Sequence, residues 1–219
     1  DCFTAHELAE FYYQKGNLLS YEDFPDEAEL QFKIGYEINQ KERYQLAYLQ
    51  SRFKLDSMPP NDELEDLVNT LDEESFPKCF IKAKSFALLK RAKEGLELLK
   101  IKYPNEITAQ MTICTIGELY KELDEIIEEN IELELDGERR KYDFNSLAAR
   151  RYFHKASHQI GIHGEILPFT GHPNYNIEEM KLSYALIQKA WISARKLGYP
   201  SDVTMLIDIS CLIYGYFNN

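Results

Sequence analysis

The sequence lacks the motifs that mark many cofactor-dependent enzymes. Its 219 residues contain no Walker loop, no dinucleotide-binding glycine fingerprint, no nucleophile elbow and no zinc-ribbon spacing. Its four cysteines have no CxxC or metal-ligand spacing; they are Cys2, Cys79, Cys114 and Cys211. We therefore expect no cofactor and no metal ion. Scattered thiols of this kind are typical of buried, reduced cysteines in a reducing compartment, so we expect a cytoplasmic protein.

Long hydrophobic runs and an excess of positive charge are also missing. No stretch approaches the roughly 18–20 apolar residues of a membrane span, and no signal peptide is visible. The net charge is −12, and residues 1–137 carry a balance of −15 whereas residues 138–219 carry +3. Negative charge repels nucleic acids and anionic membranes. We expect no membrane partner, nucleic acid only at residues 139–158, and a neutral or basic protein or peptide as the main partner.

Apolar residues recur three and four positions apart through most of the chain, which predicts amphipathic helices. Glycine and proline lie in the breaks between them, where they end or begin helices. The pattern therefore predicts an all-α protein. In the first two-thirds of the chain we expect helices at 5–15, 25–39, 42–55, 62–71, 79–92, 94–101, 107–119 and 123–135.

We expect these predicted helices to form pairs, and the pairs recur at similar intervals along the sequence. The second helices are centred 37, 31 and 29 residues apart, intervals that bracket the 34-residue tetratricopeptide repeat. The first pair resembles that family in its order of small, aromatic and glycine residues, carried by Ala9, Tyr12 or Tyr13, Gly16, Ala28 and Phe32. The resemblance covers about residues 4–135. It implies stacked antiparallel helix pairs that bind protein, whereas a plain helical bundle is the alternative with the same periodicity.

A repeat array presents a concave groove lined by the first helix of each pair. Tyrosine and arginine are the usual anchor residues of protein interfaces. We therefore expect a scaffold, adaptor or regulatory module rather than an enzyme. The candidate binding residues are Tyr12, Tyr13, Tyr44, Tyr48, Arg52, Lys84 and Tyr120. The competing interpretation of each tyrosine is that it seals a contact between helices.

The change in charge at Asp136-Gly137 predicts two regions, acidic repeats over 1–137 and a mildly basic helical region over 138–219 that packs on them. We expect the second region to open with a helix capped by Asp143 or by Asn145-Ser146 and ending near Ile160. Its polar side carries Arg150, His154 and His158 at four-residue spacing. The simplest interpretation is a solvated basic face, or a docking patch for an acidic partner or for the chain's own acidic repeats.

Two chemical interpretations of this helix stay open. His154 and His158 could share a metal ion, but Lys155 stands where zinc hydrolases carry glutamate. Arg151 and His158 have six residues between them, and this spacing in an all-α protein resembles the HEPN ribonucleases. That resemblance implies that Arg151 stabilises the scissile phosphate and that His158, beside His154, acts as general acid or base.

The last part of the chain contains a long irregular segment between two further predicted helices. Residues 161–176 carry three glycines and two prolines, and their polar members are His163, Glu165 and His172. A helix is expected at 177–197, followed by an almost wholly apolar helix at 203–217. We expect the last helix to cap the fold or to form a homodimer contact.

Overall fold

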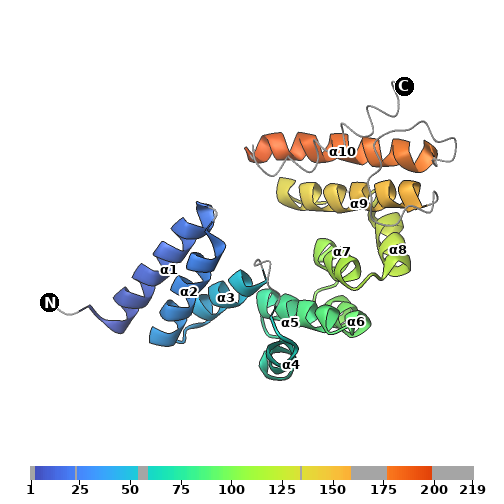
Figure 1. Ribbon diagram of the computed structural model, residues 1–219. Helices are drawn as coiled ribbons and strands as arrows, with labels where there is room; N and C mark the ends of the chain where they lie inside the picture. Colours follow the sequence, from blue (N-terminus) through green and yellow to red (C-terminus); the bar gives the residue numbers. More distant parts are fainter. Residues whose placement is uncertain (1–2, 23, 54–58, 134, 159–176, 199–219) are drawn as a thin grey trace. The chain divides into compact units, whose positions relative to one another are not determined.

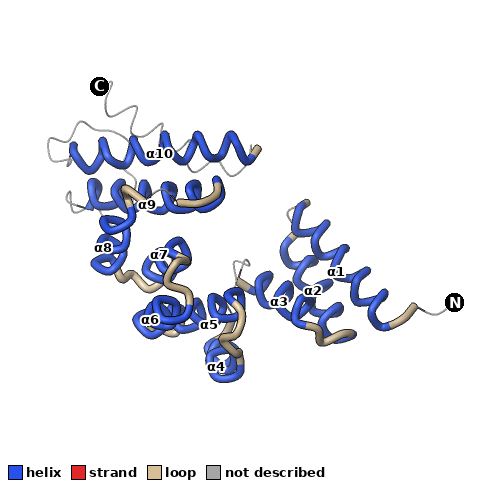
Figure 2. Tube along the Cα trace, turned by 180° about the vertical axis from the view of Figure 1, so that it is seen from behind, coloured by secondary structure: helices blue, strands red, loops and turns tan. Residues whose placement is uncertain are grey.

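The computed structural model describes residues 3–22, 24–53, 59–133, 135–158 and 177–198, and over these ranges the chain consists of helices and the turns between them (Figures 1 and 2). No strand occurs in the described ranges, so the all-α prediction is confirmed. The irregular segment 161–176 and the apolar segment 203–217 lie outside the described residues. None of the helices described is long and apolar enough to cross a membrane.

The chain divides into two compact units, residues 1–104 and residues 105–219. The charge balance instead changes at residue 137. The helices of the first unit are α1 (Ala5–Tyr21), α2 (Pro25–Ile38), α3 (Glu42–Arg52), α4 (Asn61–Thr70), α5 (Phe76–Leu88) and α6 (Ala92–Lys102). The described helices of the second unit are α7 (Ile107–Ile116), α8 (Tyr120–Asn130), α9 (Glu138–His158) and α10 (Ile177–Leu197).

Helix α1 continues past the glycine that was expected to end it. Gly16 lies inside the helix and is buried, because α2 crosses it closely. A Cβ atom at this position would lie 2.6 Å from the ring of Phe32. Gly16 therefore allows α1 and α2 to pack closely and does not end α1. The start of α1 is fixed by a capping box in which the Thr4 hydroxyl accepts from the Glu7 N–H and the Glu7 carboxylate accepts from the Thr4 N–H.

The expected start of α9 was also wrong. The helix begins at Glu138, directly after Gly137, which adopts a φ of 82°. The side chains of Asn145 and Ser146 lie within the helix and donate to carbonyl oxygens four residues earlier, at 2.7 Å each. Both side chains can satisfy a helical carbonyl as readily as an N-terminal amide, so their presence alone does not locate a cap.

The turns that join α5 to α6 and α7 to α8 have the same geometry. Each is three residues long, and its central residue is left-handed: Lys90 has a φ of 62° and Glu118 a φ of 54°. The residue after it donates to a carbonyl five positions earlier at 2.8 Å, from Arg91 to Phe86 in one turn and from Leu119 to Cys114 in the other. The two helix pairs thus repeat one turn at a spacing of 28 residues.

Packing in the first unit joins three consecutive helices through one apolar cluster. The buried side chains of Leu49, Leu67, Leu71 and Ile81 form a core cluster that links α3, α4 and α5. The partly buried Tyr48 packs against the edge of this cluster.

In the second unit, α9 and α10 lie side by side in both ribbon views (Figures 1 and 2). Glu138 contacts Lys196 at 2.9 Å, and Lys155 contacts Glu179 at 3.5 Å. Moving forward along α9 therefore moves backward along α10, so the two helices are antiparallel. Helix α10 occupies the range that the sequence predicts for it.

Candidate binding surfaces

The predicted binding residues separate into groups, and the first is largely internal. Tyr44 is only 1% exposed. Its hydroxyl lies 3.1 Å from the Glu10 carboxylate and 3.2 Å from His6 Nδ1. Burial, followed by the Glu10 hydrogen bond, raises the pKa of Tyr44. Tyr44 therefore links α3 to α1. This is the role in helix packing that was the alternative to a role in binding.

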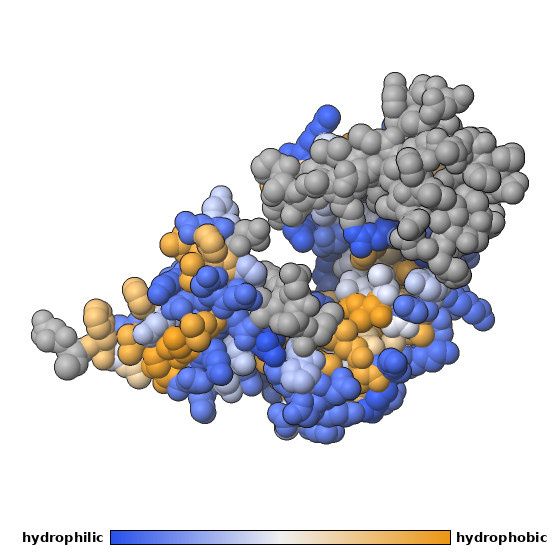
Figure 3. Space-filling view, in the orientation of Figure 1, coloured by the Kyte–Doolittle hydropathy of each residue, from blue (hydrophilic) through white to orange (hydrophobic). Residues whose placement is uncertain are grey.

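The other two tyrosines of this group lie on α1 and are half-buried. The Tyr13 ring packs edge-on against Tyr44 and has the Arg43 guanidinium 4.5 Å from its centroid. Tyr12 lies edge-on to Phe11, which is 60% exposed. Other exposed apolar side chains occur on α1 and α2, among them Leu18 and Leu30, and the space-filling view shows apolar surface there (Figure 3). Tyr12 therefore borders the surface, whereas Tyr13 and Tyr44 are more enclosed.

The second group is centred on Tyr48. Its ring stacks on that of Tyr36, with centroids 6.4 Å apart and an interplanar angle of 17°. Both tyrosines are half-buried. Burial raises the pKa of Tyr48, and the nearby Glu63, Glu29 and Glu37 carboxylates raise it further. We call Glu29, Tyr36, Glu37, Tyr48 and Glu63 the aromatic–acidic patch.

Arg52 lies within this patch but is already bonded to its acids. The Glu63 carboxylate accepts from its Nε at 3.1 Å and from its Nη2 at 2.8 Å, and Glu29 accepts from its Nη1 at 3.4 Å. The Arg52 side chain is 16% exposed. It therefore holds α2, α3 and α4 together beside Tyr48. One guanidinium against the carboxylates of Glu29, Glu37 and Glu63 leaves the patch negative.

Lys84 lies on α5, close to the residues that surround Tyr48. Its ammonium lies 4.8 Å from the Phe80 ring centroid and 5.8 Å from that of Phe53. Phe53 packs against the core cluster that also carries Tyr48. The structure thus brings Tyr48, Arg52 and Lys84 onto neighbouring parts of one face of the first unit.

The last predicted binding residue, Tyr120, belongs to the second unit and is the first residue of α8, the second helix of its pair, whereas it was predicted on the first helix. It lines a pocket of about 190 Å³ together with Arg150, Arg151 and His154 of α9. The Arg151 guanidinium lies 4.7 Å from the Tyr120 ring centroid. The Arg151 Nε and Nη2 donate to the two Asp124 carboxylate oxygens at 2.8 and 2.9 Å. Arg151 therefore already has an anionic partner, while the side chain of His158 lies outside the described residues.

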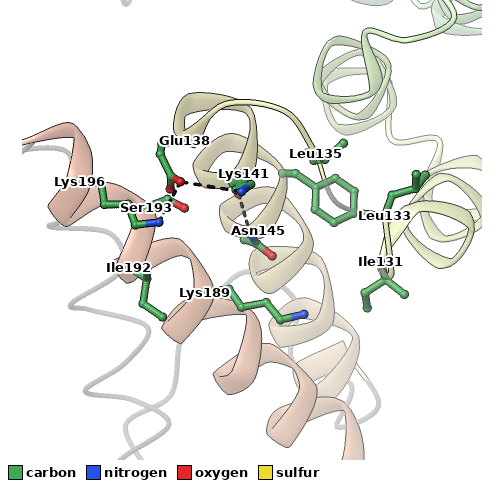
Figure 4. A pocket seen from close by; sticks show the side chains of 11 residues that line it. Ile131, Leu133, Leu135, Glu138, Lys141, Asn145, Lys189, Ile192, Ser193 and Lys196 are labelled. Atoms are coloured by element: carbon green, nitrogen blue, oxygen red, sulfur yellow. Dashed lines mark hydrogen bonds and ion pairs between the residues drawn. The ribbon is translucent and has the colours of Figure 1, made fainter.

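A second pocket of the same unit combines an apolar wall with a rim of lysines (Figure 4). It measures about 270 Å³ and lies between the end of α8, the start of α9 and the end of α10. Its apolar side chains are Ile131, Leu133, Leu135, Phe144 and Ile192, and its rim carries Lys141, Lys189, Lys196, Glu138, Asn145 and Ser193. We call it the lysine pocket.

The charges of the lysine pocket do not cancel. Glu138 is the only acid among its described lining residues, and its carboxylate contacts Lys196 at 2.9 Å and Lys141 at 3.8 Å. Lys196 and Ser193 hold the pKa of Glu138 below its usual range. Lys189 has no ion-pair partner within the described part of the chain. The described lining of the pocket therefore carries three ammonium groups and one carboxylate.

Sequence reasoning missed both Tyr36 in the aromatic–acidic patch and the whole lysine pocket. Tyr36 is a second-helix residue, so a search restricted to first helices passes over it. The lysines of the pocket come from two helices about 50 residues apart, so no local motif exists. Within the ranges that the structure describes, no group of three or more His, Cys, Asp or Glu side chains is placed to hold a metal ion.

Comparison with known proteins finds no match at the level of family models, of curated proteins or of solved structures.

Proposed function

We propose that this chain is a protein- or peptide-binding helical-repeat module that uses the aromatic–acidic patch to hold a basic or neutral partner. The observation that carries the proposal is the stacked pair of Tyr36 and Tyr48, half-buried and surrounded by Glu29, Glu37 and Glu63. Stacked tyrosine rings offer contact area at little cost in conformational entropy. Glu29 and Glu63 already bond Arg52, so the exposed Glu37 and the net negative charge of the patch favour lysine or arginine in the ligand.

Several contacts support a tetratricopeptide-like arrangement of the helix pairs. The small residues of the family pattern lie at helix contacts, with Ala9 fully buried and Ala28 1% exposed. Gly16 approaches the Phe32 ring as described above. The identical turns at Lys90 and Glu118 fit a chain built from one repeated helix pair.

A ribonuclease centred on Arg151 has less support. An arginine that stabilises a scissile phosphate needs its N–H donors directed at that phosphate, whereas Arg151 directs two of them at Asp124. RNA cleavage that disappears in the His158→Ala variant would contradict the proposed function and restore this alternative.

The proposal is tested by selecting peptides from a phage-displayed random library on the purified chain. We expect the enriched peptides to carry lysine or arginine and to lose binding to a Tyr36→Ser/Tyr48→Ser double variant. Tyr21→Ser is the matched control, because Tyr21 is 89% exposed and belongs to α1, outside the patch. Enrichment of acidic peptides, or equal binding to the double variant, would overturn the proposal.

A second variant separates loss of binding from loss of folding. Glu37 is exposed on α2, so Glu37→Lys reverses one charge of the patch without removing a packed side chain. We expect the circular dichroism spectrum to be unchanged and the affinity for a selected basic peptide to fall about tenfold, which corresponds to about 1.4 kcal/mol.

A further inference from the structure

We propose that the lysine pocket binds a small molecule that joins a carboxylate to an apolar body. This site belongs to the second unit and is independent of the peptide-binding surface proposed above. The proposal rests on three features that occur together: an apolar wall, an excess of lysine over acid, and a volume that fits a small ligand.

The apolar wall is formed by side chains that the fold leaves partly open to solvent. Leu133 is 56% exposed and Ile192 is 57% exposed, and they lie on opposite sides of the pocket (Figure 4). Phe144, which is 3% exposed, closes the wall from α9. A ligand that removes apolar surface of this kind from water binds more tightly for it, because burying such surface is favourable.

The lysines of the rim favour a ligand whose head group is negatively charged. Lys141 and Lys196 share the carboxylate of Glu138, while Lys189 extends from α10 with no ion-pair partner among the described residues. This local excess of positive charge occurs in a chain whose net charge is −12. A carboxylate beside Lys189 would complete the pairing and accept hydrogen bonds from ammonium groups. A cationic head would instead meet like charge.

The volume sets the size of the apolar body. A pocket of 270 Å³ is close to the lower end of the roughly 300–1,000 Å³ found for small-molecule sites. At about 30 Å³ for each water of liquid volume, it holds roughly nine waters. A linear acid of about eight carbons has a comparable number of non-hydrogen atoms, so octanoate is a suitable probe.

The test is titration calorimetry with octanoate, with octan-1-ol and with octylammonium, combined with methyl NMR spectra of the same samples. We expect octanoate to bind at least about tenfold more tightly than octan-1-ol, a difference of about 1.4 kcal/mol. We expect no measurable binding of octylammonium. The methyl groups that shift with octanoate should be those of Ile131, Leu133, Leu135 and Ile192.

Two charge reversals on α10 provide the decisive comparison. Lys189→Glu should abolish the preference for octanoate over octan-1-ol. Lys181→Glu makes the same change in net charge on the same helix, at a lysine outside the pocket that pairs with Glu178, and should leave the preference intact. Equal binding of acid and alcohol, absence of octanoate binding, identical effects of the two reversals, or methyl shifts elsewhere would each overturn the proposal.

Discussion

Asp124 on α8 accepts two hydrogen bonds from Arg151 on α9, at 2.8 Å from Nε and 2.9 Å from Nη2. The pair is only partly exposed, at 11% for the Arg151 side chain and 23% for that of Asp124. It also closes a contact between helices, because the two residues are 27 positions apart in the chain. This bidentate geometry makes the pair a structural link between α8 and α9.

We expect each half of this pair to matter for stability. Exposed ion pairs contribute about 0–1 kcal/mol and breaking a buried one costs about 3–5 kcal/mol, so Arg151→Met or Asp124→Asn should each cost about 1–3 kcal/mol. The double variant should cost less than the sum, which urea unfolding of all four proteins measures. Strictly additive losses would show that the two side chains do not stabilise each other.

Replacing Gly95 should destabilise the protein, although the usual effect of glycine-to-alanine in a helix is the opposite. Alanine favours helix by about 1 kcal/mol over glycine. At this position, however, a Cβ atom would lie 2.6 Å from the carbonyl oxygen of Ala83, a backbone atom that cannot move away alone. Overpacking of this kind costs about 1–3 kcal/mol.

We therefore expect Gly95→Ala to lower the free energy of unfolding by about 1–2 kcal/mol. Glu97→Ala on the same helix is the control, because Glu97 is exposed, and should change it by less than about 0.5 kcal/mol. A Gly95→Ala protein as stable as the wild type would show that α5 and α6 do not cross closely at Ala83.

Glycine should have the reverse effect at the two left-handed turn positions. Lys90 and Glu118 are both exposed and both have positive φ, a conformation that costs residues with a Cβ about 1–2 kcal/mol. Lys90→Gly and Glu118→Gly should each raise the free energy of unfolding by up to about 1 kcal/mol. Glu97→Gly, in the middle of α6, should lower it by about 1 kcal/mol. Destabilisation at all three positions would contradict the turn geometry.

The Cys79 thiol should make stability depend on pH in the alkaline range. The side chain is fully buried, and burial raises the pKa of Cys79 to about 11, against about 8.5 for an unfolded thiol. Between these values the unfolded chain releases the proton and the folded chain keeps it. The free energy of unfolding therefore falls as pH rises from about 8.5 to 11, by at most about 3 kcal/mol from this group.

Tyrosines and lysines also titrate in this range, so the measurement is a difference. Urea unfolding of wild type and Cys79→Ala at pH 8 and at pH 10.5 should show a smaller loss of stability in the variant. Equal losses in the two proteins would show that the Cys79 thiol titrates alike in the folded and unfolded chains.

The helical nature of the chain was predictable because it rests on local signals. Apolar spacing and the position of Pro25 give the presence and the approximate limits of most helices. The misjudged limits have two causes, a tertiary contact at Gly16 and a local side-chain bond at Asn145. Gly16 looks like a helix end but allows Phe32 to approach, and Asn145 looks like a cap but bonds within its own helix.

The surfaces were less predictable, because they depend on which side chains face one another across helices. Tyr48 was identified from its residue type, but its neighbour Tyr36 is set by the packing of α2 on α3. Arg151 was singled out for its spacing to a histidine, whereas its bond to Asp124 depends on the register of α8 and α9. Sequence periodicity gives the faces of helices but not the register in which they pack.

The most direct test of the binding-module account is capture from the source cell's lysate by the immobilised chain, at low and at moderate salt, with protein and RNA both analysed. The account predicts a discrete basic or neutral protein that survives moderate salt, is lost with Tyr36→Ser/Tyr48→Ser and is retained with Tyr21→Ser. RNA recovered at low salt without such a protein, or a partner that the double variant still captures, would contradict it.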